Sequence, residues 1–194
     1  SSDLEDGKRF FAKKYPDMKY LAYFQAYTNT YDVVDKLKQL YEEALKVEDV
    51  VGIVIGTRPD CVSSELLDYL EELNKRTFLI VEYGIESCND DTLRYINRGH
   101  DFACTRKAVE ETAKRGIYVG GHVIMGLPGE DASESLRQAP IISSLPLTML
   151  KIHQMQIIKG TRLAKIYKER PFHLYTIEEY IDLITQYIGL LRSD

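Results

Sequence analysis

Five short apolar segments recur along the chain, and a polar loop and an amphipathic segment follow each of them. We expect strands over residues 20–26, 50–57, 78–85, 117–126 and 149–157, which are rich in Val, Ile, Leu and Tyr. Helices are expected over residues 31–47, 63–75, 101–115, 131–144 and 176–191, where apolar residues recur at helical spacing. This alternation implies right-handed crossovers and a parallel sheet. Five strands do not close a barrel of eight, so the predicted fold class is α/β, a single domain over residues 1–194 that forms an open, partial TIM-type (β/α) barrel.

Composition and charge exclude several classes of protein. The 194 residues carry a net charge of −5, which argues against a nucleic-acid module driven by a basic patch but leaves a local RNA-binding face open. No apolar run approaches the roughly 18 residues of a membrane span. Cys61, Cys88 and Cys104 are odd in number and far apart, so they predict neither a disulfide framework nor a metal knuckle. We therefore expect a cytoplasmic protein with no membrane partner. Because the chain begins at Ser1 rather than Met, we also expect it to be a piece of a longer protein.

Side chains alternate between the two faces of a strand, and in three predicted strands one face is ionisable. Glu82 and Glu86 share a face of the third strand. His122 lies on one face of the fourth strand, and Lys151 and His153 share a face of the fifth. A buried charge has to be paired or functional, so these side chains predict a polar lumen that admits a polar ligand. An internal ion pair between Glu82 and Lys151 is the structural alternative.

Glycines mark two further points of interest. Gly120 and Gly121 lie inside the fourth strand, where glycine often indicates the close approach of another backbone or a ligand. The Gly-Leu-Pro-Gly turn at residues 126–129 follows the same strand and brings main-chain groups toward a flat ligand. No G-x-G-x-x-G motif follows a predicted strand, so a dinucleotide-binding Rossmann fold is not expected.

Six motifs, five of them at strand ends, carry a family resemblance, which runs from about residue 20 to residue 163. They lie at residues 23–31 (YFQAYTNTY), 56–60 (GTRPD), 82–87 (EYGIES), 96–100 (INRGH), 122–130 (HVIMGLPGE) and 151–161 (KIHQMQIIKGT). Each motif is loose by itself, whereas the ordered set is specific. The chain resembles the radical SAM superfamily, in particular a branch of bacterial Fe–S oxidoreductases akin to the Elongator catalytic subunit.

The resemblance implies a (β/α)6 partial barrel, a [4Fe-4S] cluster on three cysteines after strand one, and S-adenosylmethionine as cofactor. Reductive cleavage of the cofactor would give a 5′-deoxyadenosyl radical. The sequence has no cysteine triad, so its five strands correspond to strands two to six, and we expect strand one and the cluster loop upstream of Ser1. The chain alone is expected to be inactive. The parent enzyme would use a reductant such as flavodoxin or ferredoxin and act on an unknown substrate, an RNA or a small molecule.

The resemblance also assigns cofactor contacts by position. Arg98 would bind the cofactor carboxylate, Glu86 would face the ribose or methionine end, and His122 would contact the ribose hydroxyls. The loop after the first strand would contact the amino group of the methionine moiety, and the turn at residues 126–129 and the backbone near residues 156–158 would contact the adenine. The full set is Gln25, Ala26, Thr28, Glu86, Ser87, Arg98, His122, Gly126, Pro128 and Ile157. No catalytic side chain and no metal ligand are assigned. Tyr27, His153 and Lys159 are unranked candidates for facing the substrate.

Two other functions and one surface property remain open. A metal-dependent hydrolase on a TIM-type barrel would use His122, His153, Asp60 and Glu86, and a non-catalytic domain would hold RNA or a partner. If strand one is missing, the edge near residues 20–26 has no neighbour. We expect it either to be covered by residues 4–14, with Phe10 and Phe11 as the covering side chains, or to pair with a second copy.

Overall fold

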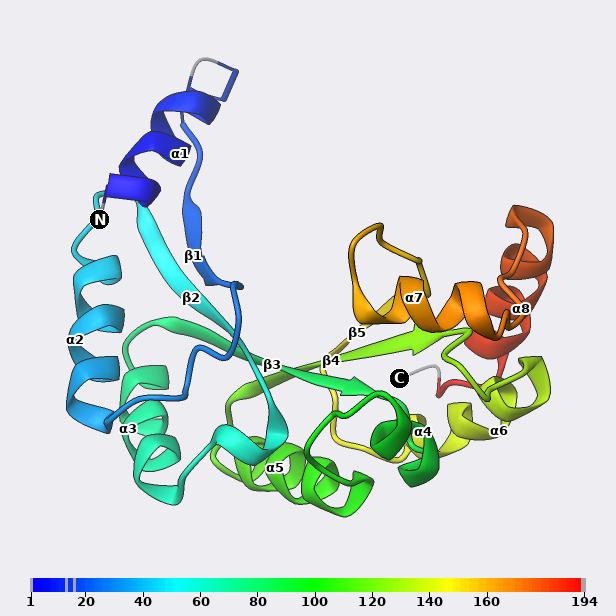
Figure 1. Cartoon of the computed structure of the whole chain (residues 1–194). Coiled ribbons are helices and arrows are strands. Elements are labelled where there is room, and N and C mark those ends of the chain that lie inside the picture. Colours follow the sequence, from blue (N-terminus) through cyan, green and yellow to red (C-terminus); the bar gives the residue numbers. More distant parts are fainter. Residues whose placement is uncertain (1, 13, 16, 193–194) are drawn as a thin grey trace.

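A computed structural model describes residues 2–12, 14–15 and 17–192. Its sheet has five strands, which are β1 (Tyr20–Phe24), β2 (Val50–Thr57), β3 (Phe78–Glu86), β4 (Tyr118–Met125) and β5 (Met149–Gln154). All neighbours pair in parallel, in the order β1-β2-β3-β4-β5. The sheet curls into a half-barrel with the two ends of the strand order on opposite sides of an open face (Figure 1). The predicted partial (β/α) barrel is confirmed, although β1 and β5 end two and three residues earlier than expected.

Helices follow the strands in alternation. They are α1 (Ser2–Ala12), α2 (Val34–Leu45), α3 (Ser64–Asn74), α4 (Asp90–Tyr95), α5 (Phe102–Lys114), α6 (Ala132–Ser143), α7 (Arg162–Glu169) and α8 (Ile177–Gly189), with a 3₁₀ turn at Pro59–Cys61. The five expected helices are present. The short helices α4 and α7 lie outside the sequence prediction, because six and eight residues are too few for a clear apolar period.

Helix starts follow the capping residues in the sequence. Thr176 and Glu179 form a complete capping box at the start of α8. At the start of α6, Asp131 accepts a hydrogen bond from the Glu134 amide at 2.9 Å. The Glu134 side chain, however, accepts from Asn89 and so connects α6 to the start of α4. The capping box is therefore complete at α8, whereas at α6 only the Asp131 half of the box forms.

The apolar face of the sheet is the convex one, and α2, α3, α5 and α6 cover it (Figure 1). Val81, Tyr83 and Ile85 of β3 are fully buried there, as the period-two alternation predicts. The hydroxyl groups of Tyr83 and Thr112 lie 2.7 Å apart, which satisfies the one polar atom that this tyrosine brings into the core. The concave face stays free of this helical layer.

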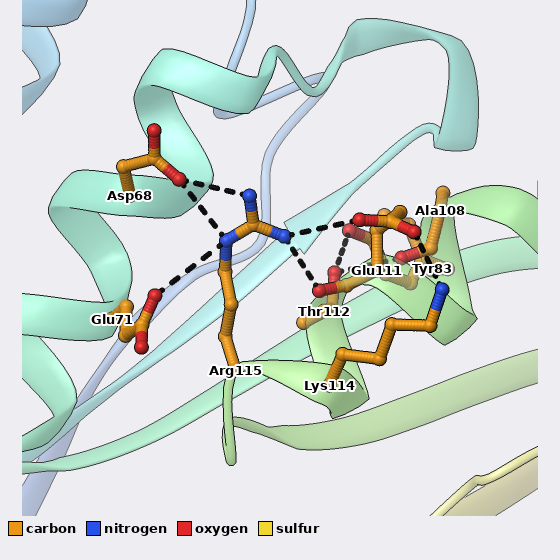
Figure 2. A network of polar contacts seen from close by, with 8 residues as sticks. All are labelled: Asp68, Glu71, Tyr83, Ala108, Glu111, Thr112, Lys114 and Arg115. Atoms are coloured by element: carbon orange, nitrogen blue, oxygen red, sulfur yellow. Dashed lines mark hydrogen bonds and ion pairs between the residues drawn. The ribbon is translucent and has the colours of Figure 1, made fainter.

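An ion-pair cluster joins two of the covering helices (Figure 2). Arg115, at the end of α5, donates to Asp68 of α3 at 2.8 Å and lies 3.8 Å from Glu71. It also bonds Glu111 one helical turn earlier, at 3.3 Å. This cluster fixes α3 against α5 on the outside of the sheet, far from the polar concave face.

Glycines in β4 accommodate side chains. A Cβ atom at Gly120 would lie 2.8 Å from Cγ of Glu82, its partner in the β3–β4 register. At Gly121 it would lie 2.8 Å from Cδ1 of Ile85 on the opposite face. The nearest atoms at these two glycines are thus side-chain atoms, from Glu82 of β3 at Gly120 and from Ile85 of β3 and Leu147 at Gly121.

The β1 edge differs from the prediction. Helix α1 lies beside β1, and its Leu4 packs against the hydrophobic core (Figure 1). Phe10 and Phe11 instead pack against each other, with ring centroids 5.1 Å apart, and are 74% and 48% exposed. These two side chains do not cover the edge, so that part of the prediction is wrong. Self-association through the edge stays a prediction.

Candidate functional site

A cavity of about 330 Å³ opens at the carboxyl ends of the first four strands. In parallel (β/α) folds this is the end of the sheet where ligands bind. The lining residues come from four strands, the loops after them and the segment after α4. They are Tyr23, Gln25, Tyr27, Thr28, Gly56, Thr57, Arg58, Glu82, Gly84, Glu86, Arg98 and His122.

The loop after β1 is fixed by side chains that bond its backbone. The Asn29 amide group donates to the carbonyls of Phe24 and Gly56, at 2.8 and 2.9 Å. The Tyr41 hydroxyl donates to the Asn29 carbonyl at 2.6 Å. Tyr27 has a φ of +62°, which a bulky residue adopts only under constraint, and its side chain is 99% exposed. The loop therefore presents polar groups to the cavity from a firmly held backbone.

An ion pair between Glu86 and Arg98 forms one wall of the cavity. Nη2 of Arg98 lies 2.9 Å from Oε1 of Glu86 and donates to the Gly84 carbonyl, also at 2.9 Å. A Cβ atom at Gly84 would lie 2.2 Å from this nitrogen, so only glycine leaves room for the pair. Glu86 itself has a φ of +66°, and the β3–β4 register shifts beside it. The end of β3 is thus shaped around the guanidinium group.

The ion pair between Glu86 and Arg98 does not fully compensate for the burial of its two side chains. Burial raises the pKa of Glu86, and the positive charge of Arg98 only partly offsets that effect. Nε of Arg98 is buried without a hydrogen-bond partner within the described part of the chain. A buried guanidinium donor with no acceptor is costly, and a ligand with an anionic oxygen would satisfy it.

Deeper on the concave face, Glu82 is the centre of a network that reaches both edges of the sheet. Its side chain is only 2% exposed, and it accepts from Tyr23 of β1 at 2.5 Å and from His122 of β4 at 2.9 Å. Lys151 of β5 donates to both carboxylate oxygens at 2.9 Å. Burial acts to raise the pKa of Glu82, but these hydrogen bonds outweigh burial and lower it. The ion pair offered as a structural alternative exists, as part of a larger network.

The network continues to a second imidazole. Nδ1 of His122 lies 3.3 Å from Nε2 of His153, and the two ring centroids are 5.2 Å apart. His153 is exposed on the concave face. The five ionisable side chains predicted to line a lumen thus lie on the concave face. Glu82, His122, Lys151 and His153 form one hydrogen-bonded group. Glu86 belongs to a second group, in which it pairs with Arg98.

The cavity contains half of the cofactor contacts predicted from the sequence. Gln25, Thr28, Glu86, Arg98 and His122 line it.

The other predicted contacts lie outside its lining. Ser87 is fully buried and donates to Glu130 near the start of α6, so it ties the end of β3 to the helical layer. Gly126 has a φ of +84° and lies against the Tyr175 ring. Ala26, Pro128 and Ile157 are also absent from the lining, and the cofactor roles of these residues remain predictions.

Tyr23 and Arg58 line the cavity although sequence reasoning did not select them as cofactor contacts. The signal for Tyr23 is its position on the concave face of β1, one residue before the strand ends. Arg58 directly follows β2 and is held by Asp60, to which its Nε donates at 2.9 Å. Both residues are predictable from the sequence if side-chain alternation and the position of each strand's end are examined in all five strands.

Metal ligation receives no support from the side chains in place. Within residues 2–12, 14–15 and 17–192, no three or more His, Cys, Asp or Glu side chains are grouped so that they could hold a metal ion. Cys61, Cys88 and Cys104 are free thiols on separate elements. The described residues therefore do not fit an iron–sulfur cluster, and among them the metal-dependent hydrolase alternative has no ligand set. No described helix is long and apolar enough to cross a membrane.

Family models match two consecutive stretches. Residues 8–137 match the radical SAM superfamily, and residues 147–194 match the Radical_SAM C-terminal domain. The boundary falls between β4 and β5, which are hydrogen-bonded neighbours in one sheet. Whether residues 1–194 act as a single domain stays a prediction.

Relatives and solved structures agree with these matches. The chain is 38% identical over 193 residues to the Uncharacterized protein YtqA of Bacillus subtilis, covering 100% of this chain and 60% of that protein. It is 31% identical over 147 residues to Elongator complex protein 3 of Saccharomyces cerevisiae, covering 73% of this chain and 25% of that protein. Thus the chain spans 60% of the length of the Bacillus subtilis protein and 25% of that of the yeast protein.

Solved structures show the same fold. The archaeal Methanocaldococcus infernus Elp3 superposes with a TM-score of 0.81 at 21% identity, covering 96% of this chain and 49% of that one. Coproporphyrinogen III oxidase (HemN) of Escherichia coli, a radical SAM enzyme, superposes with a TM-score of 0.63 at 19% identity, covering 84% and 37%. With a family model over residues 8–137, the chain belongs to the radical SAM superfamily.

Proposed function

We propose that this chain forms the S-adenosylmethionine-binding part of a radical SAM enzyme and that the cavity at the strand ends takes the cofactor. The observation that carries the proposal is the guanidinium group of Arg98, whose buried Nε has no partner among the described residues and which forms a wall of the cavity. A carboxylate such as that of a methionine moiety supplies the missing acceptor. The volume of about 330 Å³ lies within the range of small-molecule sites.

The lining residues have complementary roles toward such a ligand. Arg98 offers its donor to the carboxylate, while Glu86 beside it offers negative charge to an ammonium or sulfonium group. Thr28 supplies a hydroxyl group that suits a ribose hydroxyl or the amino group. When bound and reductively cleaved, the cofactor supplies the 5′-deoxyadenosyl radical, and the protein provides binding and orientation.

The iron–sulfur cluster is assigned to another segment of a longer protein. The three cysteines of this chain are free and dispersed, so we propose that the chain alone does not cleave S-adenosylmethionine. A cytoplasmic enzyme reduced by a flavodoxin or ferredoxin is in keeping with this proposal. Anaerobic iron and sulfide reconstitution of the 194-residue chain should yield no cluster absorbance near 400 nm; about four irons per chain would contradict the proposal.

Binding of the cofactor tests the role of Arg98. In the longer, cluster-loaded enzyme, Arg98→Ala should weaken binding of S-adenosylmethionine by about 1.5–3 kcal/mol in calorimetry, the scale of a charged hydrogen bond. Arg94→Ala is the matched control, because Arg94 lies on the adjacent helix α4 and pairs with Asp91 at the surface. Equal affinities in the wild type and the Arg98 variant would exclude this binding mode.

An RNA substrate is the candidate that a specific observation favours. Within residues 159–170, Lys159, Arg162, Lys165, Lys168 and Arg170 are all exposed, although the whole chain is acidic. Such a basic stretch, which includes α7, suits a phosphate backbone. One relative, 30% identical over 152 residues, is a tRNA uridine(34) acetyltransferase of Methanocaldococcus infernus.

Salt dependence tests this substrate class. Binding of a labelled tRNA should weaken steeply with salt, and Lys165→Glu with Lys168→Glu should reduce that dependence. The control is Lys75→Glu with Lys114→Glu, which changes the same charge on α3 and α5. Salt-independent binding, or equal effects of both double variants, would remove RNA as the favoured substrate.

A further inference from the structure

The concave-face network contains a directed chain of hydrogen bonds that the cofactor site does not use. It runs from Glu82 through His122 to His153. Glu82 and His122 also line the cavity, whereas His153 is absent from its lining and is exposed on the open face of the half-barrel. A buried carboxylate, a half-buried imidazole and an exposed imidazole are therefore hydrogen-bonded in series.

Hydrogen-bond chemistry fixes which nitrogen of each ring carries the proton. Glu82 is kept ionised, because hydrogen bonds from Tyr23, Lys151 and His122 outweigh its burial and lower its pKa. A carboxylate only accepts, so Nε2 of His122, 2.9 Å away, is the protonated nitrogen. In a neutral ring Nδ1 is then the acceptor. Nε2 of His153, 3.3 Å from that Nδ1, must therefore donate, which leaves Nδ1 of His153 with its lone pair.

Two carboxylates and two cations lie around the two imidazoles. The negative charge of Glu82 is matched by one ammonium group, that of Lys151. Glu86 is a second carboxylate whose charge acts on both His122 and His153. Against these stand the guanidinium of Arg98, paired with Glu86, and the neutral hydroxyl of Tyr23. His153 thus ends a hydrogen-bonded series that starts at a carboxylate held in place, as in other imidazole–carboxylate pairs.

We propose that His153 is a catalytic base for the substrate, with His122 and Glu82 as its positioning residues. The inference rests on the proposed function, since it concerns the substrate of that enzyme. The substrate class is one that presents an ionisable O–H or N–H group to the concave face. That bond breaks, its electron pair stays on the substrate oxygen or nitrogen, and the proton goes to Nδ1 of His153. No oxidant or reductant is consumed in this step.

The chain offers an internal control for the arrangement. His173 is also exposed and also contacts a carboxylate, with Nε2 3.1 Å from Oε2 of Glu179. It has no second imidazole in between. The rate of acylation by diethyl pyrocarbonate, mapped by peptide mass spectrometry, reports the nucleophilicity of each neutral ring.

Acylation of the 194-residue chain tests the proposal without any cofactor. We expect His153 to react faster than His173, and Glu82→Gln or His122→Gln to slow His153 by about threefold or more, following the Brønsted dependence of base strength. Glu179→Gln should slow only His173. If Glu82→Gln and His122→Gln leave the His153 rate unchanged, the network is only structural and the proposal fails.

A second measurement needs no variant and so does not depend on how a variant folds. Nitrogen-15 NMR of the histidine rings should show neutral His122 and His153 with the proton on Nε2. A proton on Nδ1 of His153 would overturn the assigned direction. Neither readout involves S-adenosylmethionine, whereas the proposed function fails separately if the longer enzyme does not bind that cofactor.

Discussion

Replacing Lys151 with methionine measures how much the ion pair with Glu82 contributes to the free energy of unfolding. The substitution keeps the aliphatic volume and removes the ammonium group that contacts both oxygens of Glu82 at 2.9 Å. Glu82 would remain buried, with Tyr23 and His122 as its remaining donors among the described residues. Breaking a buried pair by removing one partner typically costs 3–5 kcal/mol, but the Lys151 side chain is 34% exposed and partly screened. We therefore expect a loss of about 3 kcal/mol, the low end of that range.

Chemical and thermal denaturation at pH 7 measure this loss. For a chain of this size, about 3 kcal/mol corresponds to a fall of roughly 6–12 °C in Tm. The double variant Glu82→Leu with Lys151→Met removes both charges and should be more stable than Lys151→Met alone. Lys75→Met, which breaks an exposed pair with Glu72, is the control and should cost less than about 1 kcal/mol.

The same variant has a predicted pH dependence. The pKa of Glu82 is lowered in the folded chain, so its stabilising contribution is present above its unfolded pKa and is lost as the pH falls through the folded value. Once Glu82 is protonated, Lys151 contributes little. The stability difference between wild type and Lys151→Met should therefore shrink below about pH 4. A difference that is constant from pH 7 to pH 3, or a double variant less stable than the single one, would refute the reasoning.

Three further outcomes follow from single features of the fold. Gly84→Ala should displace the Arg98–Glu86 pair and lower S-adenosylmethionine affinity about tenfold or more in calorimetry, while unchanged affinity would contradict this role of the glycine. Gly116→Ala should lower the free energy of unfolding in urea by about 1–2 kcal/mol, because the φ of +71° is unfavourable for alanine. The added methyl group would meet no atom within 4 Å, so a neutral result would exclude backbone strain. Deleting residues 1–14 should raise self-association at the β1 edge, and light scattering that shows the same monomer before and after deletion would rule this out.

Face alternation in the strands was predictable because its period is two and independent of the rest of the chain. It correctly separates Glu82 and Lys151 from the buried Tyr83 and Ile85. The same alternation puts Ser87 on the convex side with Ile85, which is where the structure places it. The cofactor contact assigned to Ser87 came from the family resemblance, and the two arguments point in opposite directions.

The Arg98 wall was only partly predictable. The resemblance selected Arg98 and Glu86, but not the contact between them. Their pairing depends on the register shift beside Glu86 and on the turn after α4 that returns Arg98 to the end of β3. Neither has a signal in local periodicity, since both result from how separate elements pack. Gly84, between Glu82 and Glu86, was the available clue to a close approach.

The polar network also accounts for the curl of the sheet. Tyr23 and Lys151 lie on opposite edge strands, 128 residues apart in sequence, yet Nζ of Lys151 is 3.2 Å from the Tyr23 hydroxyl and 4.9 Å from its ring centroid. Strands β1 and β5 are not neighbours in the sheet, so this contact requires the concave face to close around Glu82. The helices on the convex face supply apolar burial that any twisted sheet could use. The buried carboxylate, which needs donors from β1, β4 and β5 at once, is what selects this curvature and so brings the strand ends into a common cavity.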